Sequence, residues 1–236
     1  MSSSNVYERI WKLETSAKQL VLENKRKPET YADLLQSFVF GSQLPDINWP
    51  KTYQKLGMEA EYAEAIKKLA FSPENPNLWV VPMVQGITCN RVVEAFRREE
   101  VQVYTCANDL DATMKHHDRD AKNGRYIIGF LRAVEADEEN KNKSANTLAS
   151  MNHKGITLPE RLVLGFGYYV ATNEHLDMTN ITLCSGSRHS DGNVPRVYWR
   201  SAFRSVCVGW CNPDRCIGSI RSRSVISLPV EQAQPA

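Results

Sequence analysis

From Leu176 onward the sequence consists of short segments in which apolar residues alternate with other residues, and this pattern constrains the fold more than any other feature. The segments NITLC, VPRVYW, SVCVGWC and RSRSVISL are separated by Gly, Asn, Asp and Pro. A period of two residues, interrupted by turn-forming residues, is typical of strands in a sheet with tight connections. We therefore predict a β-sheet at the end of the chain.

The residues before this sheet are mainly helical in pattern. Three stretches with apolar residues at helical spacing begin near Asn5, Pro28 and Tyr53, and two prolines in SPENPN (72–77) end the pattern. Further along we predict strands over 78–84, 101–106 and 125–134, a helix over 88–100, and a polar loop with a short helix over 134–155. Helices come first and strands last, which predicts an α+β fold.

The tetrapeptide TLPE predicts the start of another helix. The side chain of Thr157 can accept a hydrogen bond from the backbone of Glu160, Glu160 can do the same for Thr157, and Pro159 has a preset φ. The helix that follows carries four apolar residues on one face, which we expect to pack in the core: Leu162, Phe166, Tyr169 and Val170.

The cysteines and the apolar runs bear on location and cofactors. Six cysteines in 236 residues are too few for a disulfide scaffold, and Cys207, Cys211 and Cys216 lack the C-x2-C pair of common zinc sites. No apolar run approaches the roughly 20 residues that span a bilayer, and the start, MSSSNVYERIWKLE, lacks the apolar core of a secretory signal. We expect no cofactor, no metal and no membrane insertion. We also expect synthesis in the cytoplasm, with the final location, in the cell, on its surface or on a virus particle, left open.

Four residue types are missing from the end of the chain. Between Met178 and Glu231 there is no Lys, Glu, Gln or Met, although these types supply 41 of the first 178 residues. At that frequency, so long a gap would arise by chance on the order of once in a million. Folding does not require the gap, because an exposed antiparallel face normally accepts Lys, Glu and Gln.

Arginine is not excluded from this segment, which carries seven arginines against two aspartates and therefore a charge of +5. The arginines are Arg188, Arg196, Arg200, Arg204, Arg215, Arg221 and Arg223.

The two-residue period divides VPRVYWR and SVCVGWC into two faces. One face is large and apolar, as expected of a scaffold: Val197, Trp199, Val206, Val208 and Trp210. The other face is mixed: Arg196, Tyr198, Arg200, Ser205, Cys207, Gly209 and Cys211. An ordinary solvated surface fits Cys and Gly poorly, since free Cys is usually buried and Gly weakens strands. Tyr, Ser, Gly and Arg are instead typical of adaptable binding surfaces.

The sequence from VEADEENKNKSANTLASMNHKG to NPDRCIGSIRSRSVIS resembles the variable proteins of diversity-generating retroelements, of the type found in archaeal viruses and small-genome microbes. The most specific elements are ITLPERL, HLDMTNITLCSGSR, SDGNVP and IRSRS, and the similarity extends from Leu78 to Leu228. The resemblance implies a C-type lectin fold that displays a ligand-binding face on its last strands and loops. It also implies mutation of template adenines, and randomised AAY codons never yield Lys, Glu, Gln, Met or Trp. The missing residues match this set, except for Trp199 and Trp210 on the apolar face.

We expect three parts. Residues 1–77 lie outside the similarity, and their pattern predicts a helical N-terminal region, for which we hypothesise a role as an adaptor to a larger assembly. Residues 78–228 are a C-type lectin-like domain that displays variable residues, and residues 229–236 are a disordered tail. The sequence NPD (212–214) lacks the companion triplets of calcium-dependent sugar sites, so the fold implies nothing about carbohydrate.

The same logic extends the candidate ligand-binding positions beyond the two strands. Further candidates are Arg215, Cys216, Gly218 and Ser219, with His189 and Ile217 as secondary ones. We expect a protein that is not an enzyme and that binds a variable ligand, itself expected to be a protein. The cysteines then have no metal or redox role.

A metal-dependent enzyme is one alternative. In MKHHDRD, the side chains of His116, His117, Asp118 and Asp120 could ligate a metal. Adjacent histidines on a helix point about 100° apart and rarely bind one ion together, so we favour a solvated polar helix end.

A nucleic-acid-binding protein is the other alternative. It would use the +5 segment, with Tyr198, Trp199 and Trp210 as stacking residues. The arginines are scattered over strand and loop positions, which predicts a diffuse charge rather than a continuous basic stripe, so we do not expect nucleic acid as the partner.

Overall fold

The described part of the chain, residues 44–69, 77–226 and 228 of this computed structural model, combines helices with a principal sheet and two small ones. The helices are α3 (Trp49–Leu56), α4 (Glu59–Leu69), α5 (Cys89–Arg98), α6 (Leu110–Thr113), α7 (Ala145–Ser150) and α8 (Leu158–Thr172), with short 3-10 turns at η1 (Ala121–Asn123), η2 (Glu138–Asn140) and η3 (Ser201–Phe203). The strands are β1 (Leu78–Met83), β2 (Gln102–Thr105), β3 (Met114–His117), β4 (Tyr126–Leu131), β5 (Ile181–Leu183), β6 (Ser187–His189), β7 (Val194–Arg200), β8 (Ser205–Cys211) and β9 (Ile220–Arg221). These elements confirm the predicted mixed α+β class.

Some predicted segments lie outside the described residues. They are the helices that begin near Asn5 and Pro28, most of SPENPN, and the tail 229–236. The predicted strands over 78–84, 101–106 and 125–134 correspond to β1, β2 and β4, and the predicted helix over 88–100 corresponds to α5. The predicted short helix in the polar loop is α7.

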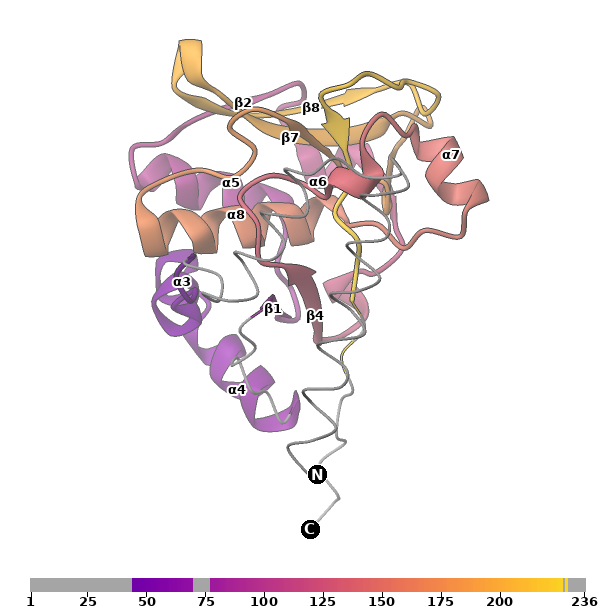
Figure 1. Cartoon of the computed structure of the whole chain (residues 1–236). Coiled ribbons are helices and arrows are strands. Elements are labelled where there is room, and N and C mark those ends of the chain that lie inside the picture. The colour runs from indigo at the N-terminus through magenta and orange to yellow at the C-terminus, as the bar shows by residue number, and fades with distance from the viewer. Residues whose placement is uncertain (1–43, 70–76, 227, 229–236) are drawn as a thin grey trace, which may run out of the picture. The chain divides into compact units, whose positions relative to one another are not determined.

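The principal sheet has the strand order β2-β8-β7-β5-β9, and Figure 1 labels its first three strands. β7 and β8 pair antiparallel, with Val197 opposite Val208 and Tyr198 opposite Cys207, as the alternation predicts. β2 joins β8 in parallel and forms one edge of the sheet. A strand from the middle of the sequence therefore lies beside the strands from its end.

The segment RSRSVISL forms a shorter strand than predicted, because its backbone changes partners along its length. β9 pairs with β5 only over Ile220 and Arg221. The next residues bond elsewhere: the carbonyl of Arg223 accepts from Ile156, 3.0 Å away, and the amide of Ile226 donates to Gly129 over 2.9 Å.

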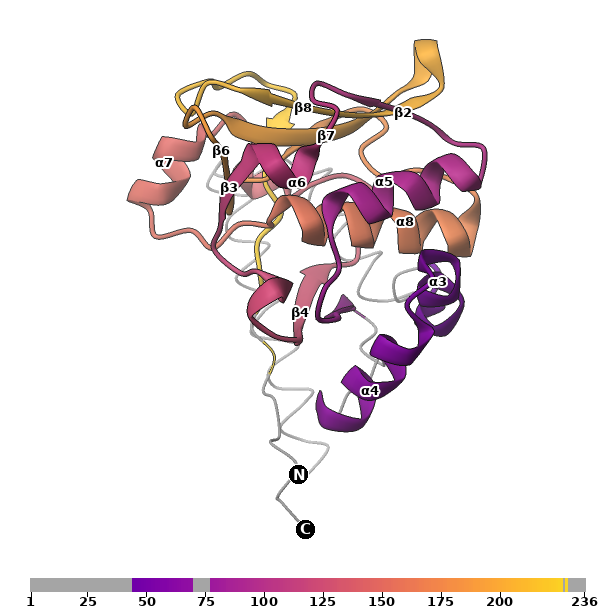
Figure 2. The ribbon, with the colours of Figure 1, turned by 180° about the vertical axis from the view of Figure 1, so that it is seen from behind.

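Helices α5 and α8 cover the inner face of the principal sheet, as Figures 1 and 2 show from opposite sides. The predicted capping box of α8 is confirmed: the amide of Glu160 donates to Thr157 Oγ1 and the amide of Thr157 donates to Glu160 Oε2. From Leu158 to Tyr168 the helix is buried on all sides, rather than on one face, because α3, α5, β1 and β7 all pack against it. Of the four predicted core residues, Leu162 and Phe166 are fully buried, whereas Tyr169 and Val170 lie half-buried at its end.

Residues 44–69 belong to the same core as the strands. The stretch predicted as one helix from Tyr53 is two helices, because Gly57 ends α3 in the left-handed conformation with φ of 67°. Tyr53 and Leu56 are buried in the main core, and the Tyr53 hydroxyl donates to the carbonyl of Pro82 on β1. The chain divides into compact units between Gln43 and Leu44 rather than near residue 77. The adaptor hypothesis then depends on residues 1–43, which lie outside the described residues.

A buried ionic cluster connects α8 to the end of the chain. Asp177 Oδ2 accepts from Arg161 Nε and Nη2 at 2.9 and 2.7 Å, and Asp177 Oδ1 accepts from Arg223 Nη2 at 2.8 Å. The hydroxyl of Thr182 also donates to this carboxylate. Burial alone would raise the pKa of Asp177, but the two guanidinium groups outweigh burial and hold the pKa below its ordinary value. The cluster therefore keeps its charge inside the protein.

Candidate functional site

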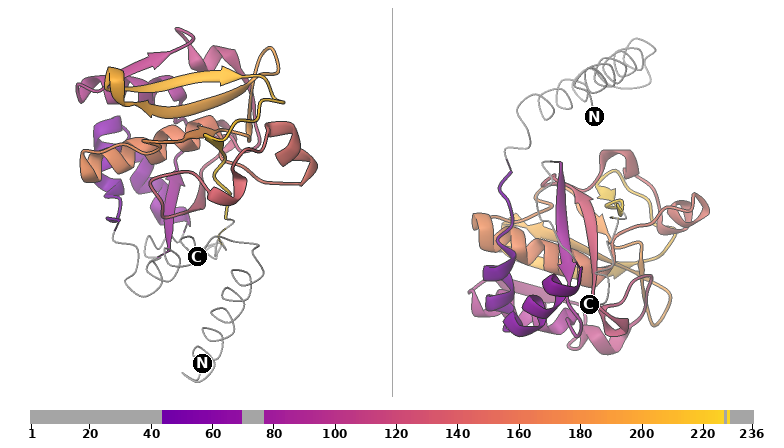
Figure 3. Two further views of the ribbon diagram at one scale, coloured as in Figure 1. Left: turned by 45° about the horizontal axis from the view of Figure 1, so that its top comes forward. Right: turned by 90° about the horizontal axis from the view of Figure 1, so that it is seen from below.

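The outer face of β7 and β8 carries all seven residues of the predicted mixed face. Directly opposite residues of an antiparallel pair point to the same side of the sheet. The register places Arg196 opposite Gly209, Tyr198 opposite Cys207 and Arg200 opposite Ser205. The residues between them, Val197, Val206 and Val208, are packed in the core with α5 and α8, which lie on one side of β7 and β8 (Figure 3, left), so the mixed residues face the other side. The structure thus brings the two predicted segments together as one surface.

The predicted scaffold residues lie on the inner side. Val197, Val206 and Val208 are buried in the main core, and Trp199 and Trp210 are half-buried and pack against it. The alternation therefore separates core-facing from outward residues as predicted.

The outer face is not uniformly exposed, which differs from the expectation of a displayed surface. Arg196, Tyr198 and Arg200 on β7 are half-exposed, but Ser205, Cys207, Gly209 and Cys211 on β8 are buried. Cys207 is only 3% exposed. The reason is that β8 lies between two strands, so that Cys207 sits between Tyr198 of β7 and Tyr104 of β2. The small residues of β8 thus lie at the bottom of a surface that is bordered by larger side chains of β2 and β7.

Gly209 has little free space around its Cα atom. A Cβ atom added there would lie 3.2 Å from the Cys106 sulfur and 4.0 Å from Nε of Arg196. The Arg196 guanidinium lies over the Tyr198 ring, with its central carbon 5.8 Å from the ring centroid, and its Nε is buried without a hydrogen-bond partner in the described residues. A larger residue at 209 therefore requires the Cys106 side chain to move.

Cys211 lies in a second apolar cluster rather than on an open surface. Its neighbours come from α7, β5, β7 and β9: Ala145, Leu148, Leu183, Val194 and Ile220, with Ile181 and Ile217 packed alongside. Burial raises the pKa of the Cys211 thiol. At this end Cys211 therefore packs against residues of α7 with Ile217 partly buried alongside, and the accessible part of the face lies toward β2.

The loop between β8 and β9 carries the remaining candidate positions. Arg215, Cys216 and Gly218 are exposed and Ser219 is half-exposed. The NPD triplet anchors this loop to α7, because Asn146 donates from its backbone to the Pro213 carbonyl and from its side chain to Asp214 Oδ1, 2.6 Å away. The other end is also held, because the amide of Ile181 donates to the Ser219 carbonyl over 2.8 Å, and the exposed residues of the loop are Arg215, Cys216 and Gly218.

Two tryptophans of the scaffold stack on histidines. His189, a secondary candidate, is stacked on Trp210 with ring centroids 4.3 Å apart. His175 is stacked on Trp199 with centroids 3.8 Å apart and ring planes inclined by 10°. Burial, with Arg161 nearby, lowers the pKa of His175 from 6.5 to about 4.

The depressed pKa of His175 predicts a pH dependence of stability. The unfolded chain binds a proton at His175 below pH 6.5, whereas the folded protein resists protonation until about pH 4. Stability from this residue is therefore full above pH 6.5 and is lost as the pH falls through this window. In urea denaturation at pH 7, 5.5 and 4.5, His175→Phe should keep the ring stack and lose less stability on acidification than the wild type. An equal loss in both proteins would contradict this prediction.

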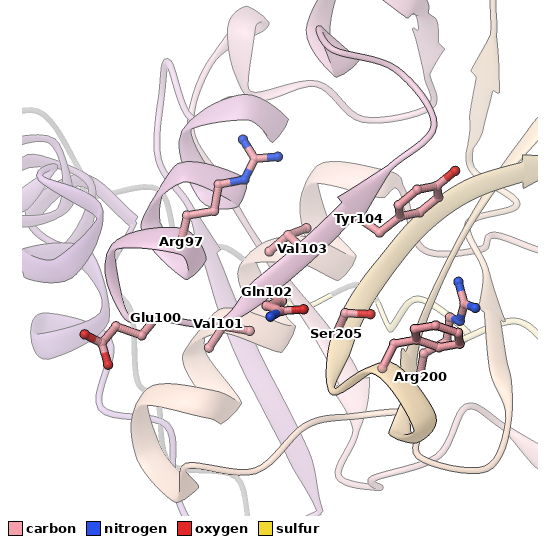
Figure 4. A pocket seen from close by; sticks show the side chains of 9 residues that line it. Arg97, Glu100, Val101, Gln102, Val103, Tyr104, Arg200 and Ser205 are labelled. Atoms are coloured by element: carbon pink, nitrogen blue, oxygen red, sulfur yellow. The ribbon is translucent and has the colours of Figure 1, made fainter.

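A hollow of about 530 Å³ borders the outer face at the β2 edge (Figure 4). It is lined by Arg97, Glu100, Val101, Gln102, Val103, Tyr104, Arg200, Phe203 and Ser205. Tyr104 and Phe203 are 56% and 59% exposed, and the Arg200 guanidinium lies 3.9 Å from the centroid of the Phe203 ring. Of these residues, only Arg200 and Ser205 are among the sequence-predicted positions. The alternation in VQVYTC indicates an outward Tyr104, but nothing local to it indicates β8 as its neighbour.

The histidine-rich segment is a strand and not the predicted helix end. β3 pairs with β6, so His116 and His117 point to opposite sides. His116 Nε2 lies 3.0 Å from Asp118 Oδ1, His117 Nδ1 lies 2.7 Å from Ser187 Oγ, and Asp120 accepts from the amide of Lys122 at the start of η1. Within residues 44–69, 77–226 and 228, no three His, Cys, Asp or Glu side chains are grouped closely enough to hold a metal ion.

Several arginines of the +5 segment have structural partners. Arg223 pairs with Asp177, Arg221 pairs with Glu138, and Arg188 donates to two backbone carbonyls at 2.8 Å. The charge near the outer face therefore comes from the remaining four, which lie on β7, at the tip of the β7–β8 hairpin and in the loop: Arg196, Arg200, Arg204 and Arg215.

Comparisons of the chain with protein family models, with curated proteins and with solved structures found no match. Among the described helices, none has both the length and the apolar character needed to cross a bilayer. All six cysteines lie in the described residues, and none of them forms a disulfide.

Proposed function

We propose that this chain is a variable protein of a diversity-generating retroelement with a C-type lectin-like fold. It acts as a binding protein without enzymatic activity, and it contacts its ligand through the outer face of β7 and β8 and the loop 215–219. One observation carries the proposal. In a segment that lacks Lys, Glu, Gln and Met, mixed residues share the outer face while the residues between them are packed in the main core.

One face of β7 and β8 packs in the core and the other faces outward, and this explains how the outward residues can vary. Val197 and Val208 lie opposite each other in the core, so core packing on the inner side stabilises the two strands. A substitution at Arg196 or Arg200 leaves these contacts intact, and surface substitutions typically change stability by no more than about 0.5 kcal/mol. The half-exposed side chains of β7 on the outer face are therefore free to change while the fold stays constant.

Affinity would come from a small number of large side chains. Tyr and Arg dominate the binding energy of most protein interfaces, and Arg196, Tyr198 and Arg200 are the large half-exposed residues on β7. Ser205 and Cys207 on β8 are more deeply buried and shape the surface between the larger side chains of β2 and β7. A protein ligand fits this arrangement, because the surface extends from the β2 edge to the loop 215–219.

Core packing on the inner side predicts that exchanges on the outer face are tolerated. Arg196→Ser should change the free energy of unfolding by less than about 0.5 kcal/mol, because Arg196 forms no ion pair in the described residues. Cys207→Ser should cost about 1 kcal/mol or less, since the hydroxyl has nearly the thiol's volume and Ser205 Oγ lies 3.8 Å from the present sulfur. Thermal unfolding followed by circular dichroism measures both changes. A loss of 3 kcal/mol or more at either position would contradict the display model.

Sequencing the genome that carries this gene tests whether a retroelement generates the variation. Sequencing the source genome should find a near-copy of the segment that encodes residues 188–227, and a reverse-transcriptase gene. The copy should differ from the gene only where the copy carries adenine, and these codons should fall on the outer face and the loop. Differences at the codons for Val197, Val206 and Val208, or a genome with neither the copy nor the enzyme, would contradict the proposal.

A further inference from the structure

The outer edge of β2 offers backbone hydrogen-bonding groups. β2 is the last strand in the order of the principal sheet. The amide of Cys106 donates to the carbonyl of Val208 on β8, 3.1 Å away. Because successive residues of a strand direct their backbone groups to opposite sides, Tyr104 also faces β8, whereas Val103 and Thr105 face outward. Apart from the β2–β8 pairing itself, no hydrogen bond within the described residues involves the backbone of Val103 or Thr105.

The hollow described above borders β2 and reaches from the end of α5 to the start of β8. Four consecutive residues of the edge line it, Val101 to Tyr104, with the end of α5 on one side and the tip of the β7–β8 hairpin on the other (Figure 4). An exposed sheet edge is a template for an added strand, and side-chain pockets beside such an edge supply specificity. Backbone groups and a pocket therefore occur together here.

The charge around the hollow favours an acidic occupant. Arg97 and Arg200 line it, against the single acid Glu100. Arg97 Nη1 lies 2.5 Å from Glu94 at the surface, whereas Arg200 forms no ion pair in the described residues and stacks on Phe203. A second copy of this chain would bring a second unpaired Arg200 to the edge, whereas an acidic segment brings carboxylates that can pair with Arg200.

We propose that the β2 edge binds an extended acidic segment of a partner protein, which adds to the principal sheet as a further strand. Its backbone pairs with Val103 and Thr105, its carboxylates contact Arg97 and Arg200, and its apolar side chains enter the hollow beside Tyr104. The inference goes beyond the proposed function, because Val101 to Tyr104 lie outside the segment without Lys, Glu, Gln and Met. The edge would thus bind in the same way in every variant of the outer face.

The test uses the full chain, labelled with ¹⁵N, and a synthetic peptide that alternates glutamate with valine and phenylalanine. The peptide should shift the amide resonances of Val103 and Thr105 and slow their hydrogen exchange. A matched peptide with lysine in place of glutamate should bind at least about tenfold more weakly. Equal binding of both peptides, or shifts confined to another surface, would overturn the proposal.

A pair of variants at Thr105 tests the strand pairing. Thr105→Pro removes an outward N–H without touching the bonds between β2 and β8, whereas Thr105→Val keeps it. Thr105→Pro should weaken binding of the acidic peptide by at least about three- to tenfold, Thr105→Val should not, and both should melt near the wild-type temperature. Unchanged binding of the acidic peptide by a folded Thr105→Pro protein would contradict the proposed strand pairing.

Two further outcomes would assign the edge to a different occupant and overturn the proposal. One is slow exchange of both edge amides in the peptide-free protein. The other is a dimer, seen by sedimentation, that Thr105→Pro dissociates. The result is independent of the genomic test: a missing template copy would leave peptide binding at the edge unaffected, and failure of peptide binding would leave the template copy unaffected.

Discussion

Asp177→Ala should destabilise the protein by about 3–5 kcal/mol, the usual cost of removing one partner from a buried ion pair. The substitution leaves the guanidinium groups of Arg161 and Arg223 in the core without their shared carboxylate, and both side chains are almost completely buried. It also removes the acceptor for the Thr182 hydroxyl. Because Arg223 lies near the end of the described chain, its release would also loosen the segment that follows β9. Urea denaturation at pH 7 measures the loss.

The control for this substitution is Glu61→Ala, which removes an exposed carboxylate from α4 and should change stability by no more than about 0.5 kcal/mol. A loss at Asp177 no larger than that of the control would show that the cluster contributes nothing to folding.

Acid should reproduce part of this effect in the wild type. The folded-state pKa of Asp177 is lower than its ordinary value of 3.8. The stability that the carboxylate contributes is therefore full above that value and is lost as the pH falls through the folded-state pKa. Asp177→Ala should lack this component of acid unfolding.

Val208→Asp should unfold the domain. Val208 is 1% exposed, lies opposite Val197 and belongs to the main core, so the new carboxylate would have no solvent and no cation beside it. Burying an unpaired charge is among the few single changes that cost more than about 4–5 kcal/mol. Circular dichroism at 25 °C should show the loss of cooperative melting.

The matched control places the same residue on the other face of the neighbouring strand. Tyr198→Asp puts the carboxylate on the outer face between Arg196 and Arg200, where it should cost about 1 kcal/mol or less. If Tyr198→Asp unfolded the protein as readily as Val208→Asp, the two faces would not differ as the display model requires.

Local patterns predicted the parts of the fold that depend on neighbours in sequence. The alternation in VPRVYWR and SVCVGWC separated core residues from outward ones, because successive side chains of a strand point to opposite sides. The capping box at Thr157 was predictable for the same reason, since both of its hydrogen bonds join residues three apart.

Predictions failed where distant segments decide the local conformation. The segment from Met114 to His117 is a strand because β6, some seventy residues further along, pairs with it. The stretch from Tyr53 is broken at Gly57, where a left-handed residue turns the chain so that α4 can also pack. The candidate site was incomplete in the same way: Tyr104 and the hollow at β2 belong to it only through the parallel pairing with β8.

The sequence by itself determined the α+β order of the chain, the two faces of β7 and β8, and the segment in which four residue types are missing. Only the tertiary structure decided which outward residues are exposed. Cys207 is covered by tyrosines of two neighbouring strands, and Cys211 is covered by α7. The physical reason is that the direction of a side chain follows from its own strand, whereas its burial depends on what packs over it. Contacts of that kind come from residues far away in the sequence.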